Sequence, residues 1–418
     1  MTDTDVVVIG AGLAGLACAG QLVEAGREVV VLEAADAVGG RVRTDPVDGF
    51  LVDRGFQLLN PAYPAVGRLV DVAALGLQTF DAGVAVRRPT GLSVVADPRR
   101  APRRLRSTLT GGLLKPRELA ALARWAGPVV ARPGRVKSAP DLTLAESLDR
   151  AGVAGPLRQE VLEPFLAGVL ADDTGTTSAT FVKLLVRTFL LGTPGLPRGG
   201  MQALPEQLAA PLGDRVRLGV RATGVEGRRD GVRVTTDTAT ISARAAVVAV
   251  AAEDVAGFSG GATPRTSGLV TWWFATDSPP YDQALLTVDG RARGPVQHAA
   301  VVSHAAPSYA PTGRHLVEAT CLPSREGATD ETAVRRHLGD LWRTSAHDWD
   351  LLVRHDIAHA LPFQAVGVGS FRTTSAARIG ERTYAAGDHR DTASIQGALV
   401  SGERIARAVL RDLGESAH

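Results

Sequence analysis

The sequence predicts an α/β fold in which a parallel, Rossmann-like sheet carries an inserted domain of mixed α+β structure. Three observations indicate this fold: a strand, glycine turn, helix and strand at the N-terminus, further buried-strand patterns between residues 216 and 251, and an amphipathic helix after residue 394. With 418 residues, of which 45% are hydrophobic, the chain is large enough for more than one domain.

The first unit begins with the apolar run 6–9, which is typical of a parallel strand buried on both faces. The glycines that follow have different functions. Gly10 allows a tight turn, Gly12 lets backbone N–H groups approach a pyrophosphate, and Gly15 lets the helix pack closely against the strand. The N-terminus of that helix would face the phosphate with its free N–H groups and the positive end of its dipole.

A second predicted strand, residues 29–32, is followed by Glu33, where a carboxylate can accept hydrogen bonds from the ribose hydroxyls of adenosine. Strand, turn, helix, strand and acid therefore occur in the order that a dinucleotide site needs. This order favours a bound dinucleotide over a purely structural turn of the same composition. By itself it does not distinguish FAD from NAD.

Gly39, Gly40 and Arg41 follow the acid within a few residues. Paired glycines and a cation at this place can approach the same pyrophosphate, which an arginine can bind with two hydrogen bonds. The alternative interpretation is a surface loop with solvated arginines.

Near the other end of the chain, Gly387 and Asp388 precede a segment, 395–413, whose apolar residues have helical spacing. Ser394 or Thr392 is the expected N-cap of this helix. Taken alone, the pattern also fits an ordinary terminal helix after a glycine turn.

Together, these three motifs resemble those of the flavin amine oxidase superfamily, which includes phytoene desaturases, carotenoid isomerases and protoporphyrinogen oxidases. The resemblance covers almost the whole chain. It implies FAD rather than NAD, bound by a Rossmann-like domain of the glutathione-reductase type into which a mixed α+β substrate domain is inserted. It also places residues 49–57 beside the flavin ring and Asp388 at the pyrophosphate, and it aligns Ala222 with a Val that usually contacts adenine through its backbone. The motifs and the resemblance predict these FAD-binding residues: Gly10, Gly12, Leu13, Ala14, Gly15, Glu33, Ala34, Gly40, Arg41, Gly55, Phe56, Gln57, Ala222, Gly387, Asp388, Ser394 and Ile395.

The FAD is expected to be non-covalent, because neither cysteine, Cys18 or Cys321, lies in the C-terminal segment that would wrap the ring. The FAD-binding domain is expected to be discontinuous and to comprise residues 1–90, 199–261 and 375–418. Residues 91–198 and 262–374 would form the substrate domain, the first part mainly helical and the second a sheet with helices. Apolar spacing predicts helices at 142–148, 157–170, 180–191, 202–212 and 329–347, and strands at 231–235, 245–251, 269–275, 296–303, 315–321 and 357–362.

The leading functional hypothesis is an FAD-dependent oxidoreductase that removes a hydride, or two electrons, from a small hydrophobic substrate of the carotenoid or isoprenoid type. The alternatives are a flavin amine oxidase that forms an imine and hydrogen peroxide, a non-catalytic lipid- or prenyl-binding module of the same fold, and, less favoured, an NAD(P)-dependent dehydrogenase. Amine oxidases usually have a Lys near the flavin and a Tyr where Ser394 stands, but no Lys follows Lys183 here. The sequence does not predict the electron acceptor or the oligomeric state.

Catalytic residues are harder to assign than the cofactor, because the flavin itself accepts the electrons. Gln57, His389 and Ser394 are the weak candidates for catalytic residues, and His389 could transfer a proton. A loop histidine bonded to backbone or water is the simpler interpretation. Four aromatic residues either line an apolar pocket or belong to the core: Trp272, Trp273, Phe274 and Phe363.

Composition excludes several classes of protein. A net charge of +2 does not suggest nucleic-acid binding, and the two cysteines favour a reducing, cytoplasmic location without a structural disulfide. The first predicted strand begins by residue 5, so no signal peptide is expected, and no apolar run of membrane-spanning length occurs. We expect no metal site, because four histidines lack the spacing to cysteines or acids that metal ligands show: His298, His304, His355 and His359.

Residues 99–137 contain many arginines and lysines, interleaved with leucines, and a single acid, Glu118. A basic amphipathic segment of this kind can lie on an anionic membrane surface. A solvated face of the substrate domain would show the same pattern, so peripheral membrane contact remains one of two interpretations.

Overall fold

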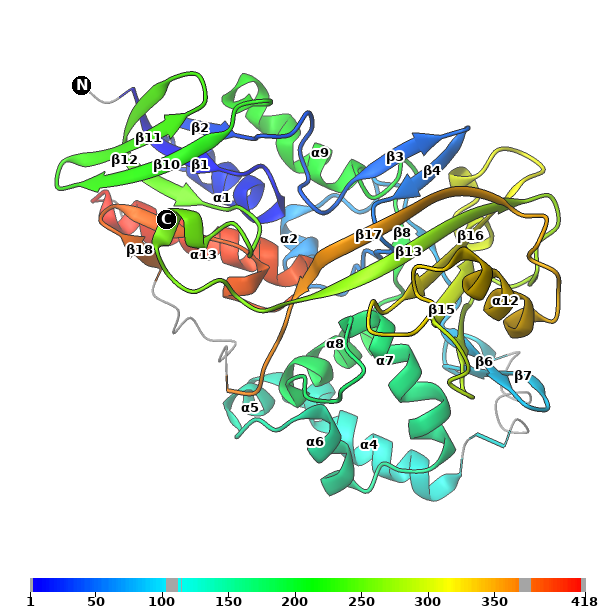
Figure 1. The fold of residues 1–418 in the computed structure, drawn as a ribbon. Coiled ribbons are helices and arrows are strands. Elements are labelled where there is room, and N and C mark those ends of the chain that lie inside the picture. Colours follow the sequence, from blue (N-terminus) through cyan, green and yellow to red (C-terminus); the bar gives the residue numbers. More distant parts are fainter. Residues whose placement is uncertain (1–2, 103–111, 114, 368–376, 415–418) are drawn as a thin grey trace.

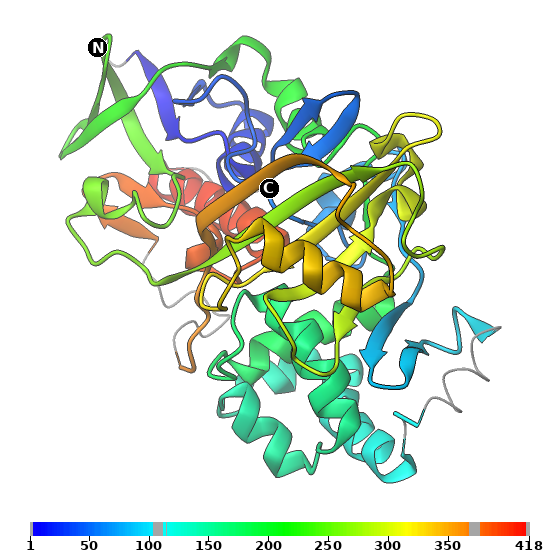
Figure 2. The same cartoon turned by 45° about the vertical axis from the view of Figure 1, so that its right-hand side comes forward.

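The computed structural model describes residues 3–102, 112–113, 115–367 and 377–414. Figure 1 shows two sheets side by side and a group of helices beneath them, coloured cyan to green. Two long strands of the second sheet reach across toward the first, and the view in Figure 2 shows the same arrangement. The segments that form the first sheet come from both ends and the middle of the chain.

The first sheet has eight strands with β1 near its centre. β1 pairs in parallel with β2 and β12, β2 pairs in parallel with β9, and β12 pairs in parallel with β19, whereas the β10–β11 hairpin is antiparallel. This parallel core confirms the predicted Rossmann-like arrangement. The strands are β1 (Thr4–Ile9), β2 (Val29–Leu32), β9 (Val216–Arg217), β10 (Ala222–Arg228), β11 (Gly231–Thr236), β12 (Thr240–Val248), β18 (Arg378–Gly380) and β19 (Thr383–Ala385).

Helices α1 (Leu13–Glu24) and α13 (Ile395–Asp412) pack against each other beside this sheet. Gly402 of α13 lies so close to α1 that a Cβ there would come 2.3 Å from the carbonyl oxygen of Ala14. The close approach brings the C-terminal segment next to the glycine turn. Three further helices complete this part: α2 (Val66–Leu69), α9 (Ala203–Ala209) and α10 (Ala256–Ser259).

The second sheet has seven strands in the order β17-β13-β16-β15-β14-β6-β7, and helix α12 (Glu331–Trp342) packs on one of its faces. Its strands are β6 (Gly83–Arg88), β7 (Gly91–Ala96), β13 (Thr266–Thr276), β14 (Leu286–Asp289), β15 (Val296–Val301), β16 (His315–Cys321) and β17 (Asp350–Pro362). The opposite face meets the first part of the molecule, because Trp273 and Ala300 share a core with Leu13, Val42 and Leu399.

A helical part packs beneath this sheet (Figure 1). It consists of α4 (Pro116–Ala131), α5 (Pro133–Ser138), α6 (Leu144–Ala151), a π-helical segment (Leu157–Leu162), α7 (Glu163–Leu170) and α8 (Ala179–Leu191). Two small antiparallel sheets of two strands each are formed by β3 (Thr44–Val47) with β4 (Phe50–Asp53) and by β5 (Gln78–Thr79) with β8 (Gly195–Leu196). A short helix, α11 (Val302–Ala305), follows β15.

Several expected boundaries are wrong. β6 lies within residues 1–90, which were expected to belong to the FAD-binding domain, but it pairs in parallel with β14 of the second sheet. The second sheet therefore begins before residue 90. The strand expected to extend to Ser303 ends at Val301, where α11 begins, and the helix expected at 157–170 starts as a π-helical segment. The start of the expected third FAD segment, residues 375 and 376, lies outside the described residues. β3, β4 and β14 were not predicted, since each has only four residues, too few for a clear alternation. β7 was not predicted either, and it begins a part of the chain that was expected to be mainly helical.

Candidate flavin and substrate site

The glycine turn between β1 and α1 is shaped by close backbone contacts. Gly10 has φ +102°, and a Cβ there would lie 2.6 Å from the carbonyl oxygen of Ala249. A Cβ on Gly15 would lie 2.0 Å from the carbonyl oxygen of Gly10, so helix and turn are in contact as predicted. Gly12 differs, because nothing lies within 4 Å of its Cβ position and no side chain caps the helix there. The N-terminus of α1 is therefore open on the side where a phosphate would bind.

The 39–41 loop lies directly against this turn. Gly39 forms a parallel bridge with Gly12 and donates a hydrogen bond from its N–H to the carbonyl oxygen of Ala11, at 2.9 Å. A Cβ on Gly40 would stand 3.6 Å from the Cα of Gly12. The interpretation as a solvated surface loop is wrong, since this segment forms one wall of the open helix N-terminus.

Arg41 links the loop to the C-terminal motif. Its Nη2 donates to the Oδ2 atom of Asp388 at 2.6 Å, and its Nη1 donates to the carbonyl oxygen of Ala360 at 2.6 Å. Burial opposes the charge on Arg41, but the adjacent Asp388 carboxylate outweighs burial and raises the pKa of the guanidinium. Segments that are more than 300 residues apart in the sequence thus meet at one ion pair.

Glu33 contacts the turn from the end of β2. Its Oε2 accepts a hydrogen bond from the N–H of Ala11, and its Oε1 accepts one from the N–H of Ala35, both at 2.8 Å. Each carboxylate oxygen has a further lone pair for a hydroxyl donor. Ala34, beside it, is exposed. Ala222, at the start of β10, is half-buried and packs in the core between this sheet and its hairpin.

The C-terminal motif completes the site. The N–H of Gly387 donates to Oγ of Ser401 at 3.1 Å, and Asp388 is buried. Ser394 is the N-cap of α13, with its Oγ accepting from the N–H of Gly397 at 3.1 Å, so the predicted cap is confirmed. Its hydroxyl is therefore bound to the helix end, and half-buried Ile395 follows it. We call the Gly10–Gly15 turn, the 39–41 loop and residues 387–388 the flavin cradle.

His389 lies beside this cradle as a neutral side chain. A Cβ on Gly387 would touch its ring at 2.3 Å, and neither ring nitrogen has a hydrogen-bond partner among the described residues. Burial lowers the pKa of His389 to about 4, although the Asp388 carboxylate acts in the opposite direction. His389 is thus uncharged at neutral pH, the form in which it was expected to transfer a proton, so this role stays a prediction.

Residues 55–57 connect the cradle to the second sheet. Gly55 has φ +85°, and a Cβ there would lie 2.8 Å from Cδ1 of Ile357. Gln57 donates from Nε2 to the carbonyl oxygen of Arg41 at 2.8 Å, which makes it a positioning residue for the 39–41 loop. Phe56 points the other way, toward the sheet, with its ring centroid 6.3 Å from that of Trp273 and 5.6 Å from that of His298.

The aromatic residues of β13 separate onto opposite faces of the sheet. Trp272 and Phe274 stack at 6.2 Å under α12, and Trp272 donates from Nε1 to the carbonyl oxygen of Ala328. Phe363 packs instead against the Arg265 guanidinium, 4.0 Å from its ring centroid. The interpretation that Trp272, Phe274 and Phe363 line one pocket is therefore wrong. Only Trp273 faces Phe56, and it too is fully buried.

The same face carries buried polar residues that were not predicted. We call Thr271, Trp273, His298, Glu318 and Thr320 the substrate face. Burial raises the pKa of Glu318 well above its usual value and lowers that of His298 to about 4. An acid inside the strand Leu-Val-Glu-Ala-Thr-Cys was the available signal, because such strands rarely bury a carboxyl group without a reason.

A comparison with known proteins identifies the family. A family model described as flavin containing amine oxidoreductase matches residues 13–410. The chain belongs to this family. Putrescine oxidase of Kocuria rosea is 33% identical over 288 residues, which cover 59% of this chain and 57% of that protein. Hydroxyneurosporene desaturase of Rhodobacter capsulatus is 52% identical over 59 residues, which cover 14% of this chain and 12% of that protein.

Among solved structures, cyclohexylamine oxidase of Brevibacterium oxydans has a TM-score of 0.69 at 17% identity and covers 98% of this chain and 99% of its own. This likeness shows the fold. The chain spans slightly more than half the length of putrescine oxidase, the curated relative with the long match. Membership of the flavin containing amine oxidoreductases implies a flavin cofactor, and the open N-terminus of α1 at Gly12 fits a dinucleotide phosphate.

The cations of the basic segment, residues 99–137, differ in their surroundings. Arg103, Arg104 and Arg106 lie outside the described residues. Arg100 binds the carbonyl oxygens at the end of α8, including that of Leu190 at 2.7 Å, so this cation has a structural partner. Glu118 is buried and pairs with Lys115.

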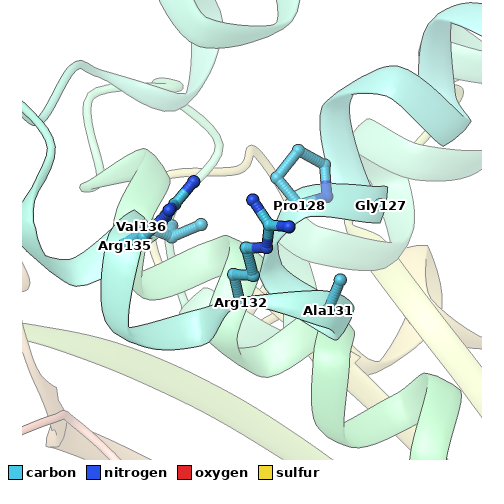
Figure 3. A pocket seen from close by; sticks show the side chains of 6 residues that line it. All are labelled: Gly127, Pro128, Ala131, Arg132, Arg135 and Val136. Atoms are coloured by element: carbon cyan, nitrogen blue, oxygen red, sulfur yellow. The ribbon is translucent and has the colours of Figure 1, made fainter.

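Arg99 pairs with Asp97 at 2.7 Å. The other described cations of that segment lie on or beside α4 and α5, where a surface cavity of about 420 Å³ opens between the two helices. Figure 3 shows the Arg132 and Arg135 side chains at this cavity, with Pro128 above Arg132 and Ala131 below it in this view. The cavity belongs to the helical part rather than to the flavin cradle (Figure 1).

Across the described parts of the chain, no cluster of three or more His, Cys, Asp or Glu side chains could hold a metal ion. No helix in residues 3–102, 115–367 or 377–414 is long and apolar enough to cross a membrane. Cys18 and Cys321 are both free and buried, and burial raises the pKa of Cys18 to about 12.

Proposed function

We propose that the protein is an FAD-dependent oxidoreductase that removes a hydride from an organic substrate bound between the flavin cradle and the substrate face. The observation that carries this proposal is the convergence of three distant segments on the open N-terminus of α1, where Gly12 leaves room and Arg41 pairs with Asp388. Bound FAD supplies the two-electron acceptor. The protein's own residues bind, orient and exclude water.

Each part of the cradle has a separate role in this proposal. The N–H groups at the start of α1 would bind the pyrophosphate, and Glu33 would accept hydrogen bonds from ribose hydroxyls. Arg41 would place its positive charge beside the phosphates while Asp388 holds its guanidinium in position. Gln57 fixes the carbonyl group of Arg41, and the rings of Phe56 and Trp273 keep water from the substrate side.

For the substrate, we propose an amine carried on a hydrophobic body. Relatives named as putrescine oxidase and cyclohexylamine oxidase support the amine, and a buried carboxyl group beneath Phe56 supports a site for a cation. The surrounding core is strongly apolar, with Trp273, Ala275, Ala300 and Leu316 buried together, which favours a hydrophobic body.

A second candidate is desaturation of a purely hydrocarbon substrate. Two observations favour it: no Lys follows Lys183, and Ser394 stands where amine oxidases usually have Tyr. The similarity to hydroxyneurosporene desaturase covers only 59 residues and so weighs less than the longer match to putrescine oxidase.

The experiment has two arms. The visible spectrum of the purified protein should show flavin, and acid precipitation should release all of its colour into solution if the FAD is non-covalent. Anaerobic mixing with hydrophobic primary amines should bleach the flavin, whereas an apolar polyene should not. A colourless protein that still binds isoprenoid chains would favour the non-catalytic lipid-binding alternative. Bleaching by the polyene alone would favour the desaturase.

We also propose that the surface of α4 and α5 contacts anionic lipid. Within residues 115–138 the exposed cations include Arg117, Arg124, Arg132 and Lys137, while the single acid of that segment is buried. Exposed Leu119 and Val130 add apolar area to the same surface. More protein should co-sediment with vesicles containing anionic lipid than with neutral vesicles. The double variant Arg132→Gln/Arg135→Gln should co-sediment less with the anionic vesicles. Equal sedimentation with both vesicle types would contradict this proposal.

A further inference from the structure

The substrate face is assembled by the register of three adjacent strands. Glu318 of β16 lies opposite Trp273 of β13, and Thr320 lies opposite both Thr271 of β13 and His298 of β15. Residues that are directly opposite in antiparallel strands point to the same face of the sheet. The oxygen Oγ1 of Thr320 donates a hydrogen bond to Oε1 of Glu318, which fixes one side of the carboxyl group.

Polar atoms on this face have unusually few partners. Glu318 is 0% exposed, and its Oε2 has no hydrogen-bond partner among the described residues. The same is true of Oγ1 of Thr271, Nε1 of Trp273 and both ring nitrogens of His298. Leaving a buried polar atom without a partner is unfavourable, so a protein rarely collects several such atoms in one place. Their concentration on three neighbouring strands indicates a surface built to bind polar groups.

The position of this face connects it to the flavin cradle. The ring of Phe56, which follows Gly55 of the 55–57 segment, covers both Trp273 and His298. His298 also meets α7 of the helical part, where a Cβ on Gly168 would come 2.6 Å from its ring. Phe56 itself is only half-buried, whereas Trp273 is fully buried.

We propose that Glu318 is the residue that binds the cationic group of the substrate, with Thr320 holding the carboxylate and the rings of Trp273 and Phe56 enclosing the cation. This inference rests on the proposed amine oxidation and names the residue that selects a charged substrate over a neutral one.

The chemistry of the face favours a cation over other polar ligands. No ion pair in the described part of the chain involves Glu318, so the protein itself supplies no positive charge to this carboxyl group. A ligand ammonium would provide both the missing charge and a donor for Oε2. Aromatic rings on two sides add a cation–π attraction that a neutral alcohol cannot gain.

The test uses the FAD-loaded protein with its flavin chemically reduced beforehand, so that a bound amine cannot be oxidised. Isothermal calorimetry under anaerobic conditions then compares benzylamine with its neutral analogue benzyl alcohol. Wild-type protein should bind the amine roughly ten- to a hundredfold more tightly than the alcohol, as expected for a hydrogen bond to a charged group. Glu318→Gln keeps the shape of the side chain and should reduce this ratio to near one. Thr320→Val should reduce it partly.

Glu326→Gln, at an exposed acid just beyond β16, is the matched control and should keep the wild-type ratio. A purely structural Glu318 would instead give a lower melting temperature with an unchanged ratio. Retention of the ratio in Glu318→Gln, or equal binding of both probes by the wild type, would overturn the inference. Failure of the proposed function is a separate result, because the calorimetric ratio does not depend on turnover. An amine that binds selectively but never bleaches the oxidised flavin would contradict amine oxidation. Glu318 would then still be a cation-binding residue.

Discussion

The flavin cradle and the substrate face are built from different parts of the chain. The cradle is mostly backbone: a Cβ at position 10 or 15 would lie less than 3 Å from a carbonyl oxygen, and Gly12 leaves the helix N-terminus open. The substrate face is made of side chains on three strands, held by register rather than by turns. A backbone site should therefore be destroyed by a single added side chain. A side-chain site should keep its fold and change its selectivity when one atom is exchanged.

The largest expected effect concerns Gly12 in the cradle. Gly12→Val should yield folded but colourless protein, because its Cβ meets no protein atom and would occupy the phosphate position. We expect the free energy of unfolding of the apoprotein to change by less than about 1 kcal/mol. Gly20→Ala, in the same helix and equally free of contacts, should retain the flavin and is the control. Normal flavin content in purified Gly12→Val would show that the cradle has been misplaced.

The ion pair between the loop and the C-terminal motif should have the next largest effect. Asp388→Ala leaves Arg41 without its acceptor and should lower stability by about 1–3 kcal/mol as well as flavin content. Asp356→Ala removes the partner of Arg354 in an exposed pair and should cost about 0–1 kcal/mol without loss of flavin. Denaturant unfolding measures the stability of each variant, and flavin absorbance measures its flavin content. Similar results for the two variants would mean that Arg41 and Asp388 form an ordinary surface pair.

The two regions share one property, a buried neutral histidine. Burial lowers the pKa of both His389 and His298 to about 4 in the folded protein, below the usual value near 6.5. As the pH falls from about 6.5 to 4, the unfolded state takes up a proton at each site before the folded state does, so stability is lost in that window.

Substitution of either histidine by Gln should therefore reduce the loss of stability between pH 7 and pH 5 by about 2 kcal/mol. Thermal or denaturant unfolding at the two pH values is the measurement. His298→Gln should also alter amine selectivity, whereas His389→Gln should not. An unchanged acid dependence in both variants would show that these rings are solvated in the folded protein.

The smallest effect is expected at Ser394. Since its hydroxyl caps α13, Ser394→Ala should lower stability by about 1 kcal/mol, and Ser394→Asp should restore most of this loss. The rate of anaerobic flavin reduction should change little in either variant. A large loss of that rate with normal stability would restore Ser394 as a catalytic residue.

These differences also explain what the sequence could predict. The glycine turn, Glu33, the 39–41 loop and the N-cap Ser394 are local patterns whose geometry follows from a few adjacent residues, and the structure brings all of them together. The role of Gln57 is different, because its bond to the carbonyl oxygen of Arg41 joins two segments and leaves no local signal.

Apart from the acid inside the strand His315–Cys321, the substrate face left no local signal, for the same reason. Glu318, His298 and Thr271 are separated by up to 47 residues and meet only through strand pairing. Apolar spacing located β13 and β16 but did not show which face of the sheet each side chain would occupy. The sequence therefore left two interpretations open for Trp272, Trp273 and Phe274, a pocket or the core. Successive residues in a strand alternate between faces, and this alternation places Trp272 and Phe274 in the core under α12.

The central claim is that the cradle and the substrate face act together to oxidise an amine. Anaerobic stopped-flow mixing of the FAD-loaded protein with a saturating hydrophobic primary amine tests it most directly. We predict complete bleaching of the flavin by this amine, and much slower bleaching in Glu318→Gln. An oxidised spectrum that persists with every amine, while a chemical reductant bleaches the same sample, would contradict the account.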